Sequence, residues 1–346
     1  MSNLSSKLNR RNVLKGTLAV AAAPAIITSA QAQSKVNWKV QSHWPKASGS
    51  FGDSLTVLAK ELEEKTDGRF QMELLGAGEI AKGGEIFNVV RRGVVQMGTT
   101  SPAYNLAEAE LMSLYMGIPG TLRDPWEAMH LNKNLGLEAA LNEQVKSKGV
   151  FYMADKAYPT ELVLKNAIEP GQDLAGVKVR SAGSLLEFLH AAGFAPQQIA
   201  GPEIYQAIAT GVVDGAHWGA AIGALSMKFW EVAPVHMRPS ILIAQDVYIM
   251  NLDAFNKLPD DLKLIFTSTV ENRYFQRSVE YKHQEAIALN TGVTKMNVKV
   301  AHYPDDVLAK FAEASKTLME KEIAKGPKAK EFAEKVNGLM KDLGYI

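Results

Sequence analysis

Hydrophobic and polar residues follow two different periods along this chain of 346 residues. Residues 36–44 (VNWKVQSHW) alternate with a period of two, which is typical of a strand, and residues 51–68 repeat apolar side chains at helical spacing and stop at Gly68. Residues 69–78 predict a second strand, and residues 84–93 predict a second helix. This order continues along the chain and predicts an α/β fold with mainly parallel sheets and helices on both faces.

Two strand-rich segments, residues 149–166 and residues 241–259, interrupt the strand and helix alternation. They predict two crossings between two α/β lobes, with a hinge and a ligand cleft between them. Residues 258–290 form one long amphipathic stretch, so we expect a long helix that spans both lobes. The predicted lobes are residues 35–156 plus 246–285, and residues 157–245 plus 286–346.

The first 32 residues have the features of an export signal. Basic residues that include the pair Arg10 and Arg11 precede the apolar run 17–28, and Ala30 and Ala32 have the spacing of a signal-peptidase site. The run is too short and too rich in alanine to span a bilayer, which favours export over a membrane anchor. The paired arginines resemble the twin-arginine signal, although general secretion remains an alternative. We expect cleavage after Ala32 and a periplasmic protein.

Composition excludes several functions. The formal net charge is +1, and four of the basic residues lie in the first fifteen positions, so no basic excess is left to hold nucleic acid. Cysteine is absent, which excludes disulfides, thiolate metal sites and thiol nucleophiles. The chain has no G-x-S-x-G elbow, no H-E-x-x-H motif and no phosphate-binding or dinucleotide-binding glycine loop.

Arg180 stands where a predicted strand ends and a helix begins, in the stretch GVKVRSAGS (residues 176–184). The carboxyl ends of strands are where open α/β sheets bind ligands. A guanidinium offers two parallel donors that match a carboxylate, whereas a lysine would supply the charge without this geometry. From its position alone, Arg180 is also compatible with an exposed cation at a strand end.

Residues 173–218 carry a long, ordered motif that resembles the solute-binding proteins of tripartite ATP-independent periplasmic (TRAP) transporters. The matching residues are Leu174, Gly176, Lys178, Arg180, Gly193, Glu203, Tyr205, Ala207, Gly211, Asp214 and Gly215. A weaker match, for instance over residues 43–80, extends the resemblance to nearly all of the chain after the signal. It implies a two-lobed, type II-like periplasmic binding protein that closes on a carboxylate-bearing solute. The partners implied are the small and large integral membrane subunits of the permease.

The resemblance also implies which residues bind the solute. It gives Arg180 the role of carboxylate ligand and Trp218 the role of an aromatic cleft wall, although Trp218 could instead belong to the core. His217 either donates a hydrogen bond to the solute or is structural. Tyr104, Trp44 and Tyr158 are further candidates, for which packing beneath a loop is an equal alternative.

We expect no bound metal and no cofactor. Relatives that bind 2-oxo acids through a sodium ion carry a Glu at the position before the one that matches Trp218. They also carry a Gln about twenty residues before the one that matches Arg180. Here those positions are His217 and Pro159, and neither offers the hard side-chain oxygen that such a cation needs.

The predicted solute is a small monocarboxylate, a 2-hydroxy or 2-oxo acid with an apolar or aromatic body. A dicarboxylate would need a second cation, for which Lys46 or Arg123 would have to reach in from a loop. A sugar would need more polar partners, because each unpaired hydroxyl in a dry cleft costs about 1 to 3 kcal/mol. The alternatives are a periplasmic lyase or isomerase with His217 as base and Arg180 as carboxylate clamp, and a purely structural or sensory domain. A homodimer formed through the C-terminal helices is a further possibility.

Overall fold

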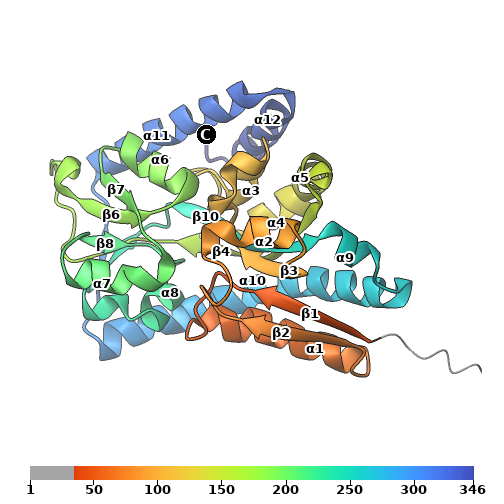
Figure 1. Ribbon diagram of the computed structural model, residues 1–346. Helices are drawn as coiled ribbons and strands as arrows, with labels where there is room; N and C mark the ends of the chain where they lie inside the picture. The colour runs from red at the N-terminus through yellow and green to blue at the C-terminus, as the bar shows by residue number, and fades with distance from the viewer. Residues whose placement is uncertain (1–34) are drawn as a thin grey trace, which may run out of the picture. The chain divides into compact units, whose positions relative to one another are not determined.

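Two β-sheets form the framework of residues 35–346, the part of the chain that the computed structural model describes (Figure 1). The five-stranded sheet has the order β2-β1-β3-β10-β4, and the six-stranded sheet has the order β11-β9-β5-β8-β6-β7. The strands of the first sheet are β1 (Val36–Gln41), β2 (Phe70–Leu75), β3 (Met97–Thr100), β4 (Val150–Thr160) and β10 (Leu242–Asn251). Those of the second are β5 (Val163–Leu164), β6 (Lys178–Ser181), β7 (Ala195–Gln198), β8 (Gly215–Ala216), β9 (Val235–Arg238) and β11 (Lys299–His302).

Both sheets are mixed, so the expectation of mainly parallel pairing holds only in part. Strand β1 pairs parallel with β2 and β3, and β6 pairs parallel with β7 and β8. The antiparallel pairs all involve β10 or β5, which lie beside the crossings between the sheets. A strand that arrives from the other sheet is not constrained by the right-handed crossover helix that makes neighbours parallel.

The chain passes between the sheets at the two predicted crossovers. Strand β4 ends at Thr160 and β5 begins at Val163, and β9 ends at Arg238 before β10 begins at Leu242. These crossings divide the fold into a first lobe around the five-stranded sheet and a second lobe around the six-stranded sheet. Two of the three lobe boundaries predicted from the sequence fall within β4 and β10, a few residues from the crossings, and the third, after residue 285, falls within a helix, residues 260–295.

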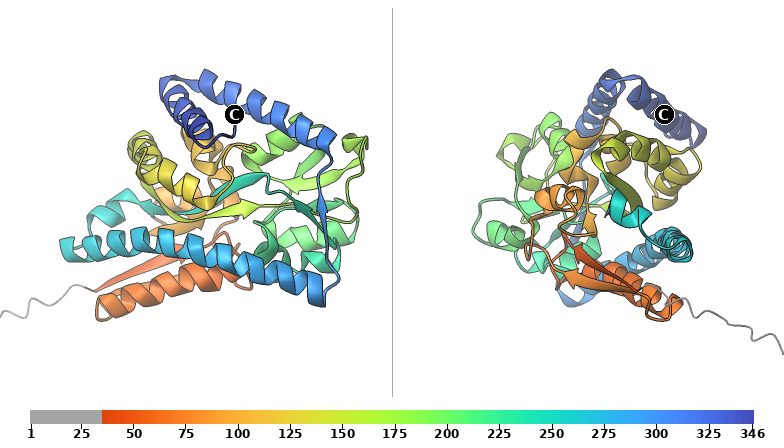
Figure 2. Two further views of the ribbon diagram at one scale, coloured as in Figure 1. Left: turned by 180° about the vertical axis from the view of Figure 1, so that it is seen from behind. Right: turned by 45° about the vertical axis from the view of Figure 1, so that its right-hand side comes forward.

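Helices cover both sheets. They are α1 (Val57–Lys65), α2 (Ile86–Arg91), α3 (Met112–Met116), α4 (Pro125–Lys133), α5 (Leu137–Val145), α6 (Gly183–Ala191), α7 (Ile204–Ala209), α8 (Ala221–Ser226), α9 (Leu252–Asn256), α10 (Asp260–Lys295), α11 (Asp305–Lys325) and α12 (Pro327–Asp342). The predicted long helix is α10, whose 36 residues run along the whole molecule and contact α1 and β4 of the first lobe and α8 of the second (Figure 2).

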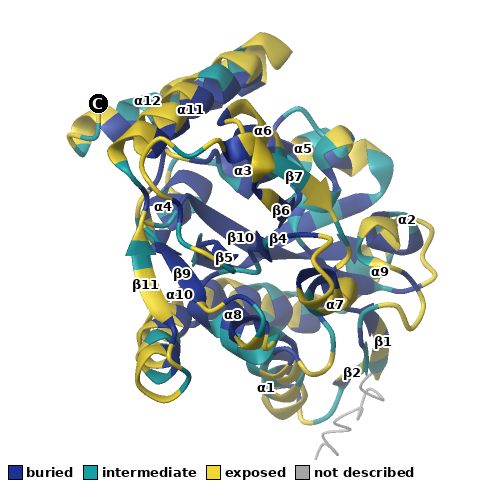
Figure 3. Ribbon diagram, turned by 90° about the vertical axis from the view of Figure 1, so that its left-hand side faces the viewer, coloured by how far each residue is buried: buried dark blue, intermediate teal, exposed yellow. Residues whose placement is uncertain are grey.

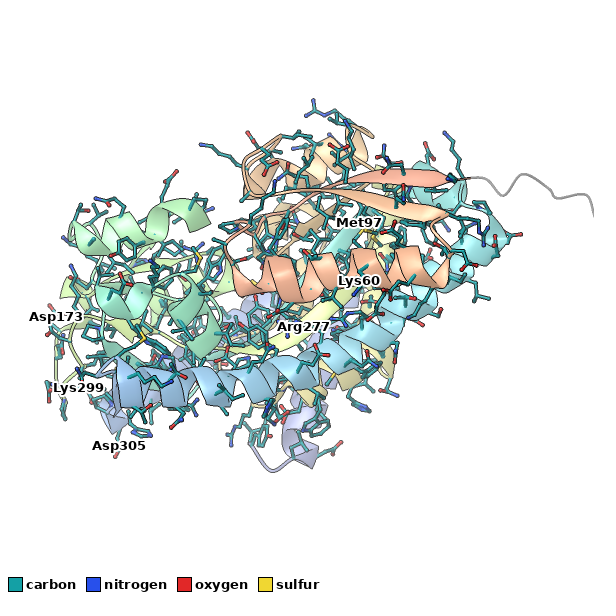
Figure 4. The ribbon with its side chains drawn as sticks, turned by 90° about the horizontal axis from the view of Figure 1, so that it is seen from below. Lys60, Met97, Asp173, Arg277, Lys299 and Asp305 are labelled. Carbon is teal, nitrogen blue, oxygen red and sulfur yellow. The ribbon has the colours of Figure 1, made fainter. Side chains whose placement is uncertain are left out.

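A buried arginine fixes α10 to the first lobe. Arg277 lies near the middle of the helix (Figure 4), and its Nε donates to Ser54 Oγ at 3.1 Å. Ser54 belongs to a π-helical turn, Phe51–Thr56, that precedes α1. The sequence predicts one continuous helix there, and the structure has a change of helical type.

The central strands form the core. All ten residues of β10 and nearly all of β4 are buried (Figure 3), including the charged residues Asp155 and Lys156 of β4 and Asp246 of β10. None of the helices in residues 35–346 has the length and hydrophobicity needed to cross a bilayer. The predicted export segment, residues 1–32, lies outside the described residues.

Candidate functional site

A cavity of about 70 Å³ lies between the two lobes, at the ends of strands from both sheets. Its walls are formed by His43, Trp44, Ser50, Ser101, Ala103, Tyr104, Met116, Tyr158, Thr160, Arg180, Ala182, His217, Trp218, Gly219, Leu242, Ala244, Asp246 and Tyr281. The structure therefore brings together all six residues that the sequence predicts for the site, namely Arg180, Trp218, His217, Tyr104, Trp44 and Tyr158. Whether they bind solute stays a prediction.

Arg180 enters the cavity from the end of β6 and is buried. Strand β6 lies between β7 and β8, so its backbone is fixed on both sides. Two backbone carbonyls hold the guanidinium in place: Nε donates to Ile199 O at 2.9 Å and Nη1 donates to His217 O at 3.2 Å. The side chain is thus oriented before any ligand arrives.

The guanidinium of Arg180 keeps unused donors. Two of its five N–H groups make the bonds just described, which leaves three on the two terminal nitrogens. Within residues 35–346, no carboxylate forms an ion pair with Arg180, although its side chain is only 2% exposed. A buried charge without a counterion is costly, so this site favours an anionic ligand.

Trp218 and His217 follow β8 and lie beside Arg180. The guanidinium carbon of Arg180 is 5.3 Å from the centre of the Trp218 ring. A side chain at Gly201 would approach the Trp218 ring to 2.4 Å, so glycine is required there for the ring to occupy this position. His217 Nε2 is 3.0 Å from Ser181 Oγ. Burial lowers the pKa of His217 well below its usual range, and the charge of Arg180 lowers it further, so the ring is neutral at neutral pH.

The first lobe supplies an aromatic wall. His43 and Trp44 follow β1, and their rings are 4.7 Å apart. Tyr104 lies in a 3₁₀ turn after β3, with its ring 6.2 Å from that of His43. Trp44 is also 4.4 Å from the ammonium of Lys156, so one face of its ring stabilises a buried cation.

A buried charge network stands behind this wall. Lys156 Nζ donates to Asp246 at 2.8 Å and to Asp155 at 3.1 Å, and Tyr158 Oη donates to Asp246 at 3.0 Å. The pKa of the Asp246 carboxyl is lowered because Lys156 and His43 outweigh the burial, which alone would raise it. A shift in register between β10 and β4 beside Asp246 places Asp155 next to this pair. The ammonium of Lys156 thus already has two carboxylate partners, so the network does not need an anionic ligand.

Thr160 is a polar residue of the cavity that sequence reasoning missed. It is the last residue of β4, and its Oγ1 is buried without a hydrogen-bond partner in the protein. Because a buried hydroxyl without a partner costs about 1 to 3 kcal/mol, this group points to a ligand or a water as its partner. The residue before it, Pro159, is the position that the sequence analysis matched to the Gln of sodium-binding relatives, and its side chain cannot form hydrogen bonds.

His43 and Asp246 were also missed. His43 follows an alternating strand pattern and Asp246 lies in a mostly apolar one, and only the pairing of β10 with β4 and β3 brings Asp246 to the cavity. Lys46 and Arg123, which the sequence analysis considered as partners for a second carboxylate of the solute, lie elsewhere. Lys46 pairs with Glu79 at 2.7 Å, and the guanidinium carbon of Arg123 lies 3.9 Å from the centre of the Tyr345 ring. Neither lines this cavity.

Comparisons with known proteins agree with this architecture. The family model of the bacterial extracellular solute-binding proteins, family 7, matches residues 41–325, and the model of the twin-arginine translocation pathway signal sequence matches residues 7–26. A monocarboxylate 2-oxoacid-binding periplasmic protein of Nostoc sp. is 25% identical, over 97% of this chain and 95% of that protein.

Solved structures show the same fold. A TRAP transporter solute-binding protein of Bordetella bronchiseptica, with copurified calcium and picolinate, aligns with a TM-score of 0.83 and 21% identity, over 90% of this chain and 93% of that one. A TRAP periplasmic solute-binding protein of Pseudoalteromonas atlantica, with bound sodium and pyruvate, aligns with a TM-score of 0.82 and 21% identity. The alignment covers 90% of this chain and 96% of that one. The two-lobed fold predicted from the sequence is confirmed. The chain carries a twin-arginine export signal, is a periplasmic protein, and belongs to family 7 of the bacterial extracellular solute-binding proteins.

Proposed function

We propose that this protein captures a small 2-hydroxy or 2-oxo monocarboxylate in the cavity between its lobes and delivers it to the membrane subunits of a TRAP permease. The observation that carries this proposal is the buried guanidinium of Arg180, which lines the cavity with three free donors and has no carboxylate partner in the described residues. The solute's carboxylate supplies the missing charge and accepts two parallel hydrogen bonds.

A single carboxylate fits the charges around the cavity. The second buried cation, Lys156, already donates to Asp155 and Asp246. A second carboxylate on the solute would instead face Asp246, the acidic residue among those that line the cavity, and the two negative charges would repel. Dicarboxylates are therefore disfavoured.

The hydroxyl of Thr160 supplies the partner for an oxygen next to the carboxylate. A hydroxyl both donates and accepts hydrogen bonds, so it suits a 2-oxo group as well as a 2-hydroxy group. Such acids are also what the named relatives hold: the Nostoc protein is a 2-oxoacid-binding protein, and the Pseudoalteromonas structure contains pyruvate.

The residues around the cavity do not suit the calcium or sodium that the two solved structures contain. Sodium and calcium require several oxygen ligands, and within residues 35–346 no group of three or more His, Asp or Glu is placed to hold a metal. Asp246 is already bound by Lys156 and Tyr158. We therefore propose that solute binding needs no cation.

Both lobes contribute to the cavity, so closure completes the site. Arg180 and Trp218 come from the second lobe, and Trp44, Tyr104 and Thr160 come from the first. A solute that contacts both groups stabilises the closed arrangement over the open one. The closed form is then what the two membrane subunits of the permease recognise.

A thermal-shift screen tests this function. The protein is dialysed against EDTA and mixed with pyruvate, lactate, branched 2-oxo acids and aryl 2-hydroxy acids, beside C4 dicarboxylates and uronates, with and without sodium or calcium. We expect stabilisation by one or more monocarboxylates without added cation. Stabilisation by a dicarboxylate or a sugar acid alone would contradict the proposed solute class, and a strict need for a cation would contradict the metal-free site.

We further propose that the protein binds its solute without chemical conversion. A lyase or isomerase using His217 as base would consume the acid that binds best, so incubation followed by NMR of the solute separates the two functions. No specific feature of the cavity favours the enzyme. A homodimer through the C-terminal helices stays a prediction, which light scattering of the eluting protein tests.

A further inference from the structure

A second and larger cavity, of about 590 Å³, lies on the other side of the crossover between β9 and β10. It is lined by Gly120, Leu122, Arg123, Phe188, Arg238, Pro239, Ser240, Ile241, His302, Leu308, Phe311 and Ala312, and we name it the crossover pocket. Ile241 lines this pocket, and the next residue, Leu242, lines the solute cavity. Successive side chains of an extended segment point to opposite sides, so the two cavities are separate.

One wall of the crossover pocket is apolar. Phe188 of α6 and Phe311 of α11 have ring centres 5.1 Å apart, and they join the two helices that flank the pocket. Leu308, one turn before Phe311 on α11, is 36% exposed. Figure 3 shows α11 on the same side of the molecule as β9 and β11, whose ends supply Arg238 and His302. Apolar lining with a few polar groups is typical of small-molecule sites, and the volume is in their usual range.

The ionisable groups of the crossover pocket are all basic. Its described lining contains Arg123, Arg238 and His302 and no carboxylate. Among these, Arg238 has only a loose counterion: its Nη2 is 3.5 Å from Glu161 Oε1, and its Nε is buried without a hydrogen-bond partner. The Glu161 carboxylate is already bonded to His236 and Ser240, so Arg238 retains donors for another anion.

Arg123 faces the pocket from the first lobe. Its guanidinium carbon is 3.9 Å from the centre of the Tyr345 ring, and stacking of this kind leaves the N–H groups at the edge of the guanidinium plane free to bind. Within residues 35–346, no ion pair involves Arg123. The pocket thus combines two guanidinium groups at its polar side with an aromatic and aliphatic wall.

We propose that the crossover pocket is a second binding site, for an amphipathic organic anion whose carboxylate lies between Arg238 and Arg123 and whose aliphatic chain packs on Leu308 and Phe311. This site does not depend on the function proposed for the solute cavity. Charge complementarity selects an anion, and the apolar wall selects one with a chain of several carbons. A small, strongly hydrated anion would leave the wall uncovered.

Titration with octanoate, followed by methyl NMR, tests the second site. We use the Arg180→Gln protein, so that the solute cavity no longer offers a carboxylate clamp. Octanoate is expected to shift the methyl signals of Ile241 and Leu308 in a saturable way and to leave Leu242 unchanged. Octanamide, which has the same chain without the charge, is expected to bind at least about tenfold more weakly, the scale of one charge-assisted hydrogen bond.

Two substitutions in the same background complete the test. Arg238→Gln and Arg123→Gln are each expected to weaken octanoate binding about tenfold. Arg123 is exposed, so its substitution keeps the test valid if Arg238→Gln disturbs the buried Glu161. Arg92→Gln, an exposed arginine on the first lobe, is the control and is expected to change nothing. Shifts confined to Leu242, equal binding of octanamide, or unchanged affinity in both arginine variants would overturn the proposal.

Discussion

The guanidinium carbon of Arg180 lies 5.3 Å from the centre of the Trp218 ring, within the range of a cation–π contact. Both residues line the solute cavity, but they reach it from different strands, β6 and β8. The ring covers the cation and excludes water, which strengthens any hydrogen bond that the guanidinium makes to an anion. This contact prepares the cation for a ligand and does not neutralise it.

Replacing Arg180 by alanine should therefore abolish tight binding. The solute's carboxylate would be left in a dry cavity without its counterion, and we expect a loss of more than about 3 kcal/mol, or over a hundredfold in Kd. Arg92→Ala is the matched control, because Arg92 is exposed at the end of α2 and should bind as the wild type does. Isothermal titration calorimetry, with the acid that stabilises the protein best, measures the Kd of both variants. A Kd that changes by less than about threefold for Arg180→Ala would contradict the role of Arg180 as the carboxylate ligand.

Thr160 should determine how the protein distinguishes 2-oxygenated acids from plain ones. Thr160→Val keeps the shape and removes the hydroxyl, so we expect pyruvate or lactate to lose about 1 kcal/mol of binding energy and propanoate to lose almost none. Measuring the Kd of pyruvate, lactate and propanoate for the wild type and for Thr160→Val gives the coupling energy between the Thr160 hydroxyl and the oxygen at carbon 2 of the acid. Equal losses for pyruvate and propanoate would show that Thr160 acts through the shape of the cavity alone.

The sequence predicted those parts of the site that depend on local pattern or on the family motif. Arg180 and Trp218 belong to the ordered segment 173–218, and each stands at the end of a strand. The long helix was also predictable, because its apolar period runs unbroken through residues 258–290 and the structure places α10 at Asp260–Lys295.

The remaining parts depend on strand pairing, which a single sequence does not reveal. Asp246 reaches Lys156 because β10 and β4 pair antiparallel with those two residues opposite each other. Thr160 looks like any other strand residue until the cavity shows that its hydroxyl has no partner. Pairing partners far apart in the chain, rather than local propensity, decide both cases.

Gly183 should be essential for closure of the two lobes. It starts α6 in the second lobe, and a side chain there would lie 2.7 Å from Ala103 Cβ of the first lobe. Gly183→Ala is expected to weaken solute binding by at least tenfold, about 1.4 kcal/mol, because the lobes must separate to avoid the clash. X-ray scattering should show a larger radius of gyration with solute than the wild type shows.

Gly171→Ala is the matched control for that experiment. Both glycines have a positive φ, +62° for Gly183 and +75° for Gly171, so both substitutions carry the same backbone strain of about 1 to 2 kcal/mol. No atom lies within 4 Å of a side chain built at Gly171. Equal solute affinity in the two variants would show that strain, and not contact between the lobes, is what Gly183 avoids.

Lys156 should be required for stability. Lys156→Met leaves Asp155 and Asp246 buried without their cation, and we expect a loss of about 3 to 5 kcal/mol in the free energy of unfolding. Lys39→Met is the control on another strand, because Lys39 is exposed, 3.8 Å from Glu73, and should change stability by less than about 1 kcal/mol. Urea unfolding measures both, and similar losses would show that the buried network contributes no more than a surface pair.

Glu285 should make the stability of the protein depend on pH. It lies on α10, and its carboxylate accepts hydrogen bonds from the backbone N–H groups of Ala221 and Ile222 at the start of α8. Burial raises its pKa to about 7, and these two N–H groups offset the effect only in part. The folded state therefore holds the proton more tightly than the unfolded chain, in which the pKa is about 4.3.

The sign of the effect follows from this difference in pKa. The stability that Glu285 contributes is fully present below about pH 4.3 and is lost as the pH rises through about 7, by at most about 4 kcal/mol. In Glu285→Gln the side chain does not titrate, yet its carbonyl oxygen still accepts one of the N–H groups. Urea unfolding of both proteins between pH 5 and 8 should show the wild type losing stability relative to the variant as the pH rises. Parallel stability curves for the two proteins over this range would show that Glu285 is ionised throughout and that its bonds to α8 outweigh its burial.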